Sequence, residues 1–138
     1  MDYLVVFTDG ASRGNPGKAA CGFYIKGVTK LPKVYYLGER TNNFAEYLAI
    51  IKALEFLKSE RVKNARVRVI SDSKLVINQI KGNFKIKNKN LIPLAKRIKE
   101  ILKELKENGV EVYFENKSRK TKGIAYVDKA LNLFLDTK

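Results

Sequence analysis

The stretch that most constrains the fold of this chain is an apolar run near its N-terminus, Tyr3-Leu4-Val5-Val6-Phe7-Thr8. Aromatic and β-branched residues in such a run predict a buried strand at the centre of a sheet, with neighbours on both sides. The run stops at Asp9-Gly10. A carboxylate at the end of a buried strand indicates either a functional group or simply the start of a turn over 10–17, because Asp is also a common turn residue.

Length and composition limit what Asp9 can belong to. The 138 residues suffice for one well-filled core, so a single domain over residues 1–138 is expected. Apolar residues make up 45% of the chain and charged residues 30%, a globular mixture. No run approaches the ~20 apolar residues of a membrane span, no secretory signal is visible, and the one cysteine, Cys21, cannot form an internal disulfide. We therefore expect a cytoplasmic monomer with no membrane partner.

The charge balance points to a polyanionic partner. Lys and Arg number 28 against 14 Asp and Glu, a formal net charge of +14. Such an excess attracts nucleic acid. Lysine-rich faces can equally keep a small protein soluble, and abundant Lys, Glu and Ile also suit a heat-adapted protein. Because acidic residues are scarce, a convergence of several of them would not be a by-product of an acidic surface.

The period of the apolar pattern predicts the order of the elements. Two further strands, 19–28 and 34–40, would form an antiparallel meander with the first. A helix over 43–58 follows, because apolar residues recur there at steps of three and four. The remaining expected elements are a strand at 65–70, a short helix at 74–81, a basic loop at 83–90, a helix at 91–107, a strand at 110–115, a basic loop at 116–123 and a helix at 124–136.

This order predicts an α/β protein with a mixed five-stranded sheet, three antiparallel strands followed by parallel ones, flanked by helices. If the helix 43–58 is a right-handed crossover between parallel neighbours, Asp9 and Asp72 end adjacent strands. Glu46, in the first turn of that helix, would then lean over the same crevice. Three carboxylates could thus meet at one edge of the sheet.

Each of these carboxylates also has a plainer explanation. Glu46 can form a capping box with Asn43, and either Asp72 or Ser73 can cap the helix 74–81. If the carboxylates do converge, they repel one another or take up protons unless a cation lies between them. Oxygen ligands suit Mg²⁺ or Mn²⁺, and a chain without His and with one Cys has few routes to a zinc site.

Three motifs occur in a fixed order along the chain. They are Thr8-Asp9-Gly10-Ala11-Ser12-Arg13-Gly14-Asn15-Pro16-Gly17, Thr41-Asn42-Asn43-Phe44-Ala45-Glu46 and Ser71-Asp72-Ser73. Together, and over nearly the whole chain from Tyr3 to about Leu135, they resemble type 1 ribonuclease H. The resemblance implies the ribonuclease H-like fold and a catalytic domain that hydrolyses the RNA strand of RNA–DNA hybrids. It further implies an endonuclease with a two-metal mechanism, two Mg²⁺ ions with Mn²⁺ as an alternative, and 5′-phosphate and 3′-hydroxyl products.

By position, the resemblance assigns the catalytic, metal-binding carboxylates to Asp9, Glu46, Asp72 and Asp128. Asp128 has an alternative explanation, as a residue at the start of the last helix that is favoured by the helix dipole. The surrounding sequence, Gly123-Ile124-Ala125-Tyr126-Val127-Asp128, also departs from the family pattern.

The resemblance also implies substrate contacts. Hydrogen bonds that recognise the RNA 2′-hydroxyl groups are expected from Gly10, Ser12, Asn15, Asn42 and Asn43. Thr41 and Asn88 match a phosphate pocket for the DNA strand, and Lys81, Lys85, Lys87 and Lys89 are expected to add sequence-independent attraction. Asn15 and Asn42 can equally be plain turn formers.

One departure concerns proton transfer. Many relatives carry a His in the loop after the fifth strand, and this chain has no His. Arg119, Lys120 or Lys122 could replace its charge, but none is a good proton carrier near neutral pH. Two other functions stay open. One is a related enzyme with another polynucleotide reaction, such as cleavage of double-stranded RNA or DNA strand transfer. The other is a non-catalytic nucleic-acid-binding module with the same fold, which the changed sequence around Asp128 permits. Proofreading-type exonucleases are disfavoured, because they need a second acidic residue where this chain has Ala11.

Overall fold

The computed structural model describes residues 2–138. Its elements are β1 (Asp2–Gly14), β2 (Gly17–Ile25), β3 (Lys33–Arg40), α1 (Asn42–Ser59), β4 (Ala65–Ser71), α2 (Lys74–Ile80), α3 (Ile92–Glu107), β5 (Val110–Asn116) and α4 (Lys122–Leu135). Among the described residues, no helix is both long enough and apolar enough to cross a membrane.

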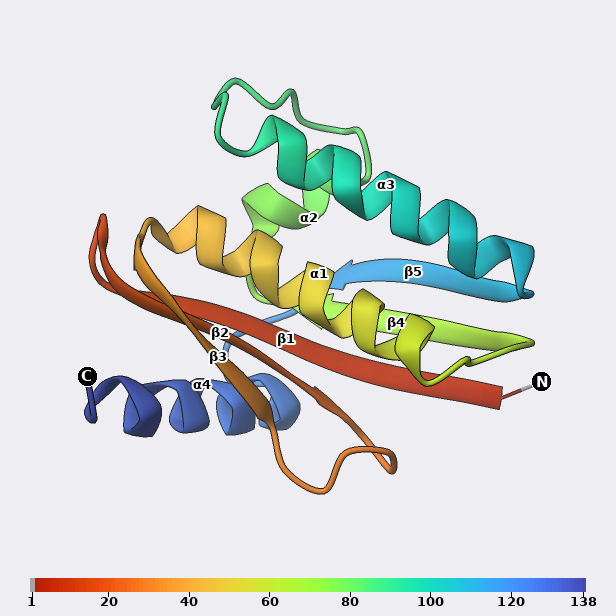
Figure 1. Ribbon diagram of the computed structural model, residues 1–138, viewed down its shortest axis with the longest axis horizontal. Coiled ribbons are helices and arrows are strands. Elements are labelled where there is room, and N and C mark those ends of the chain that lie inside the picture. The colour runs from red at the N-terminus through yellow and green to blue at the C-terminus, as the bar shows by residue number, and fades with distance from the viewer. Residues whose placement is uncertain (1) are drawn as a thin grey trace.

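The strands form one five-stranded sheet in the order β3-β2-β1-β4-β5. β1, β2 and β3 pair antiparallel, whereas β1 with β4 and β4 with β5 pair parallel. The predicted mixed sheet is therefore confirmed, and β1 and β4 are parallel neighbours (Figure 1). The crossover differs from the expectation, because α1 leads from the edge strand β3 to β4 and passes over β2 and β1. The central place of β1 agrees with its apolar run.

β1 is longer than the sequence pattern predicts. Its pairing with β4 ends at Phe7 and Ile70, but its pairing with β2 continues to Gly14 and Gly17. Asp9 therefore lies inside β1, beside the end of β4, and the predicted turn over 10–17 is wrong in its extent. The turn is confined to Asn15-Pro16 because the antiparallel partner β2 keeps the chain extended on both sides of it.

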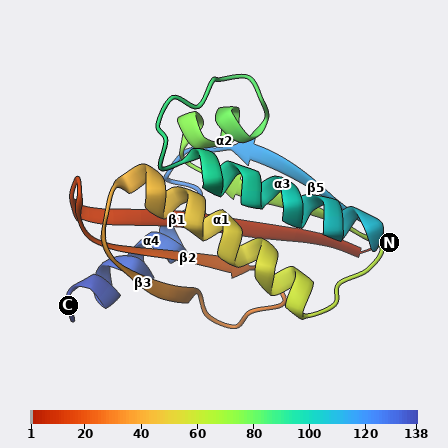
Figure 2. The same ribbon diagram turned by 45° about the horizontal axis from the view of Figure 1, so that its top comes forward.

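The helices cover the sheet on two sides. α1 and α3 lie on one face and α4 lies on the other (Figures 1 and 2). The larger core fills the space under α1 and α3, with Val6 and Phe23 from the sheet and Leu54 from α1 among its buried residues. A smaller core lies under α4, around Leu131 and Ala20.

α1 approaches β1 unusually closely at Gly10. A Cβ atom placed on Gly10 would lie 2.4 Å from the backbone carbon of Ala45. Only a residue without a side chain lets the start of α1 rest directly on the strand. This contact brings Glu46, the next residue of α1, to the backbone of β1.

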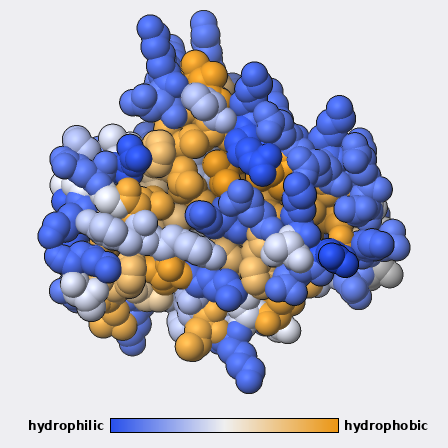
Figure 3. Space-filling model, in the orientation of Figure 1, coloured by the Kyte–Doolittle hydropathy of each residue, from blue (hydrophilic) through white to orange (hydrophobic). Residues whose placement is uncertain are grey.

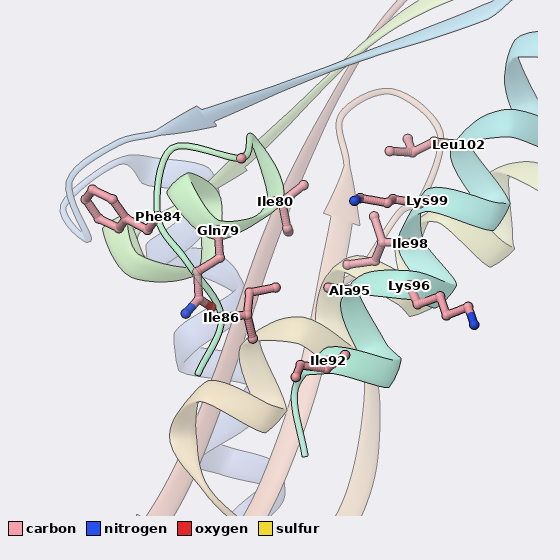
Figure 4. A pocket seen from close by; sticks show the side chains of 11 residues that line it. Gln79, Ile80, Phe84, Ile86, Ile92, Ala95, Lys96, Ile98, Lys99 and Leu102 are labelled. Carbon is pink, nitrogen blue, oxygen red and sulfur yellow. The ribbon is translucent and has the colours of Figure 1, made fainter. Parts of the chain in front are cut away.

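The loop after α2 is anchored by apolar side chains although its lysines are exposed. Ile86 packs against the main core, and a hollow of about 460 Å³ separates the loop from α3. Figure 4 shows Ile80 and Ile86 facing Ile98 across this hollow, with Lys96 directed away from it. In the space-filling view, hydrophobic residues are visible between the hydrophilic ones on this side of the molecule (Figure 3). The basic loop is therefore fixed to the core through Ile86, which its lysine-rich sequence alone did not indicate.

The close approach at Gly10 generates a prediction for stability. Gly10→Ala should lower the free energy of unfolding by about 2 kcal/mol or more, because the added methyl group overlaps the backbone of α1. Gly82→Ala is the control, since Gly82 has a positive φ but open space around its Cβ position. Urea unfolding of both variants measures the difference. A destabilisation by Gly10→Ala no larger than that by Gly82→Ala would contradict the close packing.

Candidate active site

Three carboxylates meet where β1, α1 and β4 come together. Asp9 projects from β1, Glu46 from the second turn of α1, and Asp72 follows the last residue of β4. One oxygen atom from each lies within 4.8 Å of the others. Side chains that are far apart in sequence are therefore brought together by the parallel pairing of β1 with β4 and by α1, which leads from β3 to β4 and packs on β1.

Asp9 is the most strongly constrained of the three. It is 0% exposed, and neither of its carboxylate oxygens has a hydrogen-bond partner among the described residues. Burial, and then repulsion from Glu46, raises the pKa of Asp9 far above its usual range. A buried carboxylate without a hydrogen-bond donor costs free energy. Within residues 2–138, Asp9 therefore lacks a positively charged or hydrogen-bonding partner that a bound cation could provide.

Glu46 is held by two hydrogen bonds. The backbone N–H of Gly10 donates to Oε1 at 2.7 Å, and the Ser71 hydroxyl donates to Oε2 at 3.1 Å. Burial raises the pKa of Glu46 as well. The proposed capping box with Asn43 is wrong, because Thr41 is the N-cap and its hydroxyl accepts from Phe44 N. Glu46 instead accepts from the N–H of Gly10, which lies on β1 beyond the end of its pairing with β4.

Among the described residues, Asp72 is the one member of the cluster with a cationic partner. Arg119, in the loop between β5 and α4, donates from Nε to Asp72 Oδ2 at 2.9 Å. Of the two capping alternatives for α2, Ser73 is the cap, since its hydroxyl accepts from Val76 N. Asp72 is thus free of the helix end and directed to the carboxylate cluster.

Asp128 stands apart from the close group but faces the same cleft. This cleft, of about 510 Å³, is lined by Gly10, Ser12, Asn42, Asn43, Glu46, Asp72, Asp128 and Asn132, among others. The charge of Asp128 contributes to the raised pKa of Asp9. The alternative that Asp128 is a helix-start residue is wrong, because α4 begins at Lys122 and has no acidic residue in its first turn.

The glycine-rich turn and the start of α1 are joined by side-chain amides. The N–H of Ser12 donates to Asn42 Oδ1, and the N–H of Asn42 donates to Asn15 Oδ1, both at 2.9 Å. The Ser12 hydroxyl donates to Arg40 O at 2.8 Å. Asn15 and Asn42 therefore do organise the backbone, as the turn-forming alternative proposed, but only through their oxygens. Their amide N–H groups have no protein partner among residues 2–138.

Thr41 and Asn88 line a second hollow beside this rim. The hollow measures about 400 Å³ and includes Arg40 and Lys89. Asn88 accepts from Asn90 N through Oδ1, which leaves its amide N–H groups available as donors. Lys85 and Lys87 are exposed on the same loop but do not line this hollow. Thr41 and Asn88 thus lie together, as expected for a phosphate pocket, with Lys89 as the nearest of the loop lysines.

Two residues of the site were not singled out from the sequence. Ser71 orients Glu46, and Asn132 lines the cleft from α4 while donating to Asp128 O. Ser71 directly follows the buried strand residue Ile70, and a hydroxyl at that point was the one available signal. Nothing in the sequence marks Asn132, because its role depends on how α4 crosses the sheet.

The donor set fits a hard divalent cation. Every converging ligand atom is a carboxylate oxygen, and both oxygens of Asp9 are unpartnered among the described residues. Mg²⁺ and Mn²⁺ prefer such oxygen ligands. A cation would also relieve the mutual repulsion of the carboxylates.

Comparisons with known proteins agree with this geometry. The model of the RNase H family matches residues 1–127. Ribonuclease H of Novosphingobium aromaticivorans is 40% identical over 81 residues, which cover 58% of this chain and 54% of that protein. Bifunctional protein Rv2228c of Mycobacterium tuberculosis is 34% identical over 95 residues, 66% of this chain and 26% of that protein. The matches therefore span about half and about a quarter of these relatives.

A solved structure extends the similarity over nearly the whole chain. The structure of LC11-RNase H1 in complex with an RNA/DNA hybrid has a TM-score of 0.77 and 33% sequence identity. The alignment covers 96% of this chain and 99% of that one. The sheet order and the placement of the helices are thus those of this family.

The unpartnered state of Asp9 generates a prediction for the metal-free protein. Asp9→Asn should raise the free energy of unfolding in EDTA by about 1–2 kcal/mol, because the amide is neutral without the proton that Asp9 must take up when burial raises its pKa, and because the amide can donate to Glu46. Asp72→Asn is the matched control and should give no gain, since Asp72 already has Arg119 as a partner. Thermal unfolding compares the two. A lower stability for Asp9→Asn, or an equal gain for both variants, would contradict the picture of an uncompensated Asp9.

Proposed function

This chain belongs to the RNase H family, and we propose that it is a divalent-metal-dependent endonuclease that hydrolyses the RNA strand of RNA–DNA hybrids. The observation that carries the proposal is the convergence of Asp9, Glu46 and Asp72 within 4.8 Å, with both oxygens of Asp9 unpartnered. A protein that only bound nucleic acid would have no reason to keep so costly an arrangement. All these groups come from one chain, which supports action as a monomer.

The four carboxylates Asp9, Glu46, Asp72 and Asp128 are proposed as ligands of two Mg²⁺ ions, with Mn²⁺ as an alternative. Such ions supply an activated water, and they stabilise the charge on the leaving oxygen, which gives 5′-phosphate and 3′-hydroxyl ends. The protein's part is to hold the ligands. Gly10 N–H and Ser71 fix both oxygens of Glu46, so this carboxylate keeps its orientation. Asp128 faces the cleft from α4, across from Glu46 on α1.

Recognition of RNA is proposed to come from amide donors at the cleft rim. A 2′-hydroxyl distinguishes RNA from DNA and is read by hydrogen bonds in a shallow groove. Asn15 and Asn42 have their oxygens engaged and their N–H groups available, and Asn43 lines the cleft beside them. Gly10 and Ser12 are proposed to shape the backbone at this rim rather than to donate to the substrate. The N–H of Ser12 already donates to Asn42, and its hydroxyl already donates to Arg40 O.

The DNA strand is proposed to bind at the second hollow. Thr41, Asn88 and Lys89 line it together. The Thr41 hydroxyl accepts from Phe44 N and so keeps its own proton for a phosphate oxygen. Lys81, Lys85 and Lys87 add charge along the same loop, which favours binding without sequence preference.

Arg119 is proposed to supply charge in place of the family's histidine. Its guanidinium lies on Asp72 and does not release a proton near neutral pH. We therefore assign it no proton transfer. Its role is to place a fixed positive charge at the edge of the cluster, where the substrate phosphate would arrive.

A cleavage assay with matched duplexes tests the proposed function. RNA–DNA hybrid, double-stranded RNA and double-stranded DNA of one sequence are incubated with Mg²⁺, Mn²⁺ or EDTA. We expect cleavage of the hybrid's RNA strand with either metal, none with EDTA, and none for Asp9→Asn, which should still bind the hybrid. Asp2→Asn, the same change at the exposed end of β1, should retain full activity. Metal-dependent cleavage of double-stranded RNA at a similar rate would move the assignment to the broader nuclease, and near wild-type cleavage by Asp9→Asn would overturn it.

The basic loop generates a prediction for salt dependence. Replacement of Lys81, Lys85, Lys87 and Lys89 by Gln should flatten the plot of log binding constant against log salt concentration, by about one unit of slope for each phosphate that these lysines neutralise. The control replaces Lys30, Lys63, Lys103 and Lys106, which are equally exposed but lie on other parts of the molecule. Both variants remove the same charge from the protein. An unchanged slope for the loop variant, or equal changes for both, would contradict direct phosphate binding by the loop.

A further inference from the structure

A further hollow lies on the α4 side of the sheet, separate from the carboxylate cleft and from the hollow of Thr41 and Asn88. It has a volume of about 340 Å³ and lies between β1, β2 and the first turns of α4. Its lining residues are Phe7, Tyr24, Lys26, Lys122, Gly123 and Tyr126. This volume is within the range of sites for small organic ligands. Three aromatic rings and two lysines thus share one wall of the molecule.

The aromatic rings form a connected surface. Phe7 and Tyr24 are directly paired on β1 and β2, and their rings are nearly parallel, at 17° with centroids 6.4 Å apart. Tyr126 of α4 meets Tyr24 edge-on, at 81° and 5.0 Å. Tyr126 is nevertheless 39% exposed, so it is not simply part of the core under α4. Phe7 and Tyr24 are half-buried and Gly123 packs on the Phe7 ring, so the accessible ring is that of Tyr126, which can stack on a nucleobase.

The two lysines are not neutralised by the protein. Neither Lys26 nor Lys122 forms an ion pair in the part of the chain that the structure describes, and both are exposed. They approach the hollow from different elements, Lys26 just after β2 and Lys122 at the start of α4. Two unpaired cations beside the accessible ring of Tyr126 complement a ligand that carries both a flat base and a phosphate.

The hollow lies near the carboxylate cluster but on the other side of α4. Phe7 and Asp9 lie two residues apart on β1 and project to the same side, about 7 Å apart along the strand. Tyr126 and Asp128 project to opposite flanks of α4, because residues two apart on a helix do not face the same way. Arg119 lines the cleft and Lys122 lines the hollow, so a nucleic-acid strand that leaves the cleft past Arg119 and rounds the start of α4 reaches the hollow.

We propose that this hollow binds an unpaired nucleotide of a single-stranded segment that flanks the hybrid, with the base on the aromatic rings and its phosphate on Lys26 and Lys122. The inference rests on the proposed function, because the hybrid places the flanking strand. Paired bases are stacked within their duplex and cannot offer a face to these rings, whereas unpaired bases can. A purely apolar ligand would leave the two lysines without a counter-charge.

The test compares binding of blunt and extended hybrids in EDTA, where cleavage does not occur. Fluorescence anisotropy measures the dissociation constant of one blunt hybrid and of four versions, each with a short single-stranded extension at one end of the DNA or the RNA strand. We expect at least one extension to tighten binding by about fivefold or more. The four arms identify which strand and which end the hollow accepts.

Variants connect this gain to the hollow. Tyr126→Ala and Lys26→Gln should each remove most of the gain while leaving cleavage of the blunt hybrid in Mg²⁺ unchanged. The controls are Tyr3→Ala, a tyrosine that is 71% exposed on the far part of β1, and Lys30→Gln, a lysine in the turn after β2; both should keep the gain. If no extension tightens binding, or if the gain survives Tyr126→Ala and Lys26→Gln, the proposal is wrong. Absence of blunt-hybrid cleavage would instead count against the proposed function, since the binding comparison does not depend on it.

Discussion

The repulsion between Asp9 and Glu46 is the constraint around which this structure is arranged. Asp9 on the central strand β1 and Glu46 on α1 are buried side by side, and of the two only Glu46 has donors among the described residues. Burying two carboxylates in contact costs free energy. The fold tolerates the arrangement because its two cores, above and below the sheet, are filled independently of it. The unfavourable free energy of burying two carboxylates is thus confined to the cluster, where a bound divalent cation would offset their repulsion.

The geometry of β1 explains how that point is built. β1 continues beyond the last residue that pairs with β4. The N–H groups of Gly10 and Ser12 on this side of β1 therefore have no neighbouring strand to donate to. A buried N–H needs an acceptor. Glu46 and Asn42, one helical turn apart on α1, supply the two acceptors. The same unpaired edge therefore orients a proposed metal ligand and a proposed substrate contact, and Gly10 permits both by letting α1 approach.

Much of this could be predicted from the sequence, and the failures have identifiable causes. Periodicity predicted the elements and their order, because the two sides of each strand and helix differ strongly in burial. It did not predict that β1 continues through Asp9 to Gly14, because strand length there is decided by the partner β2. It assigned the cap of α1 to Asn43 rather than to Thr41, because both are good caps and the choice depends on where Glu46 is needed. Asn132 was out of reach, since its position in the cleft follows from the crossing of α4 over the sheet.

The surface charge and the fixed polar groups of the cleft have different proposed roles, attraction of nucleic acid and discrimination among nucleic acids. A net charge of +14 attracts any polyanion, so attraction alone cannot discriminate among nucleic acids. Discrimination must come from groups with fixed directions, and we propose for this the amides of Asn15 and Asn42, whose oxygens are already bonded within the protein. Arg119 also combines two tasks, because one guanidinium both partners Asp72 and adds charge to the cleft. A lysine-rich protein can thus select among nucleic acids when the neutral and acidic side chains of its cleft are fixed by hydrogen bonds and ion pairs within the protein.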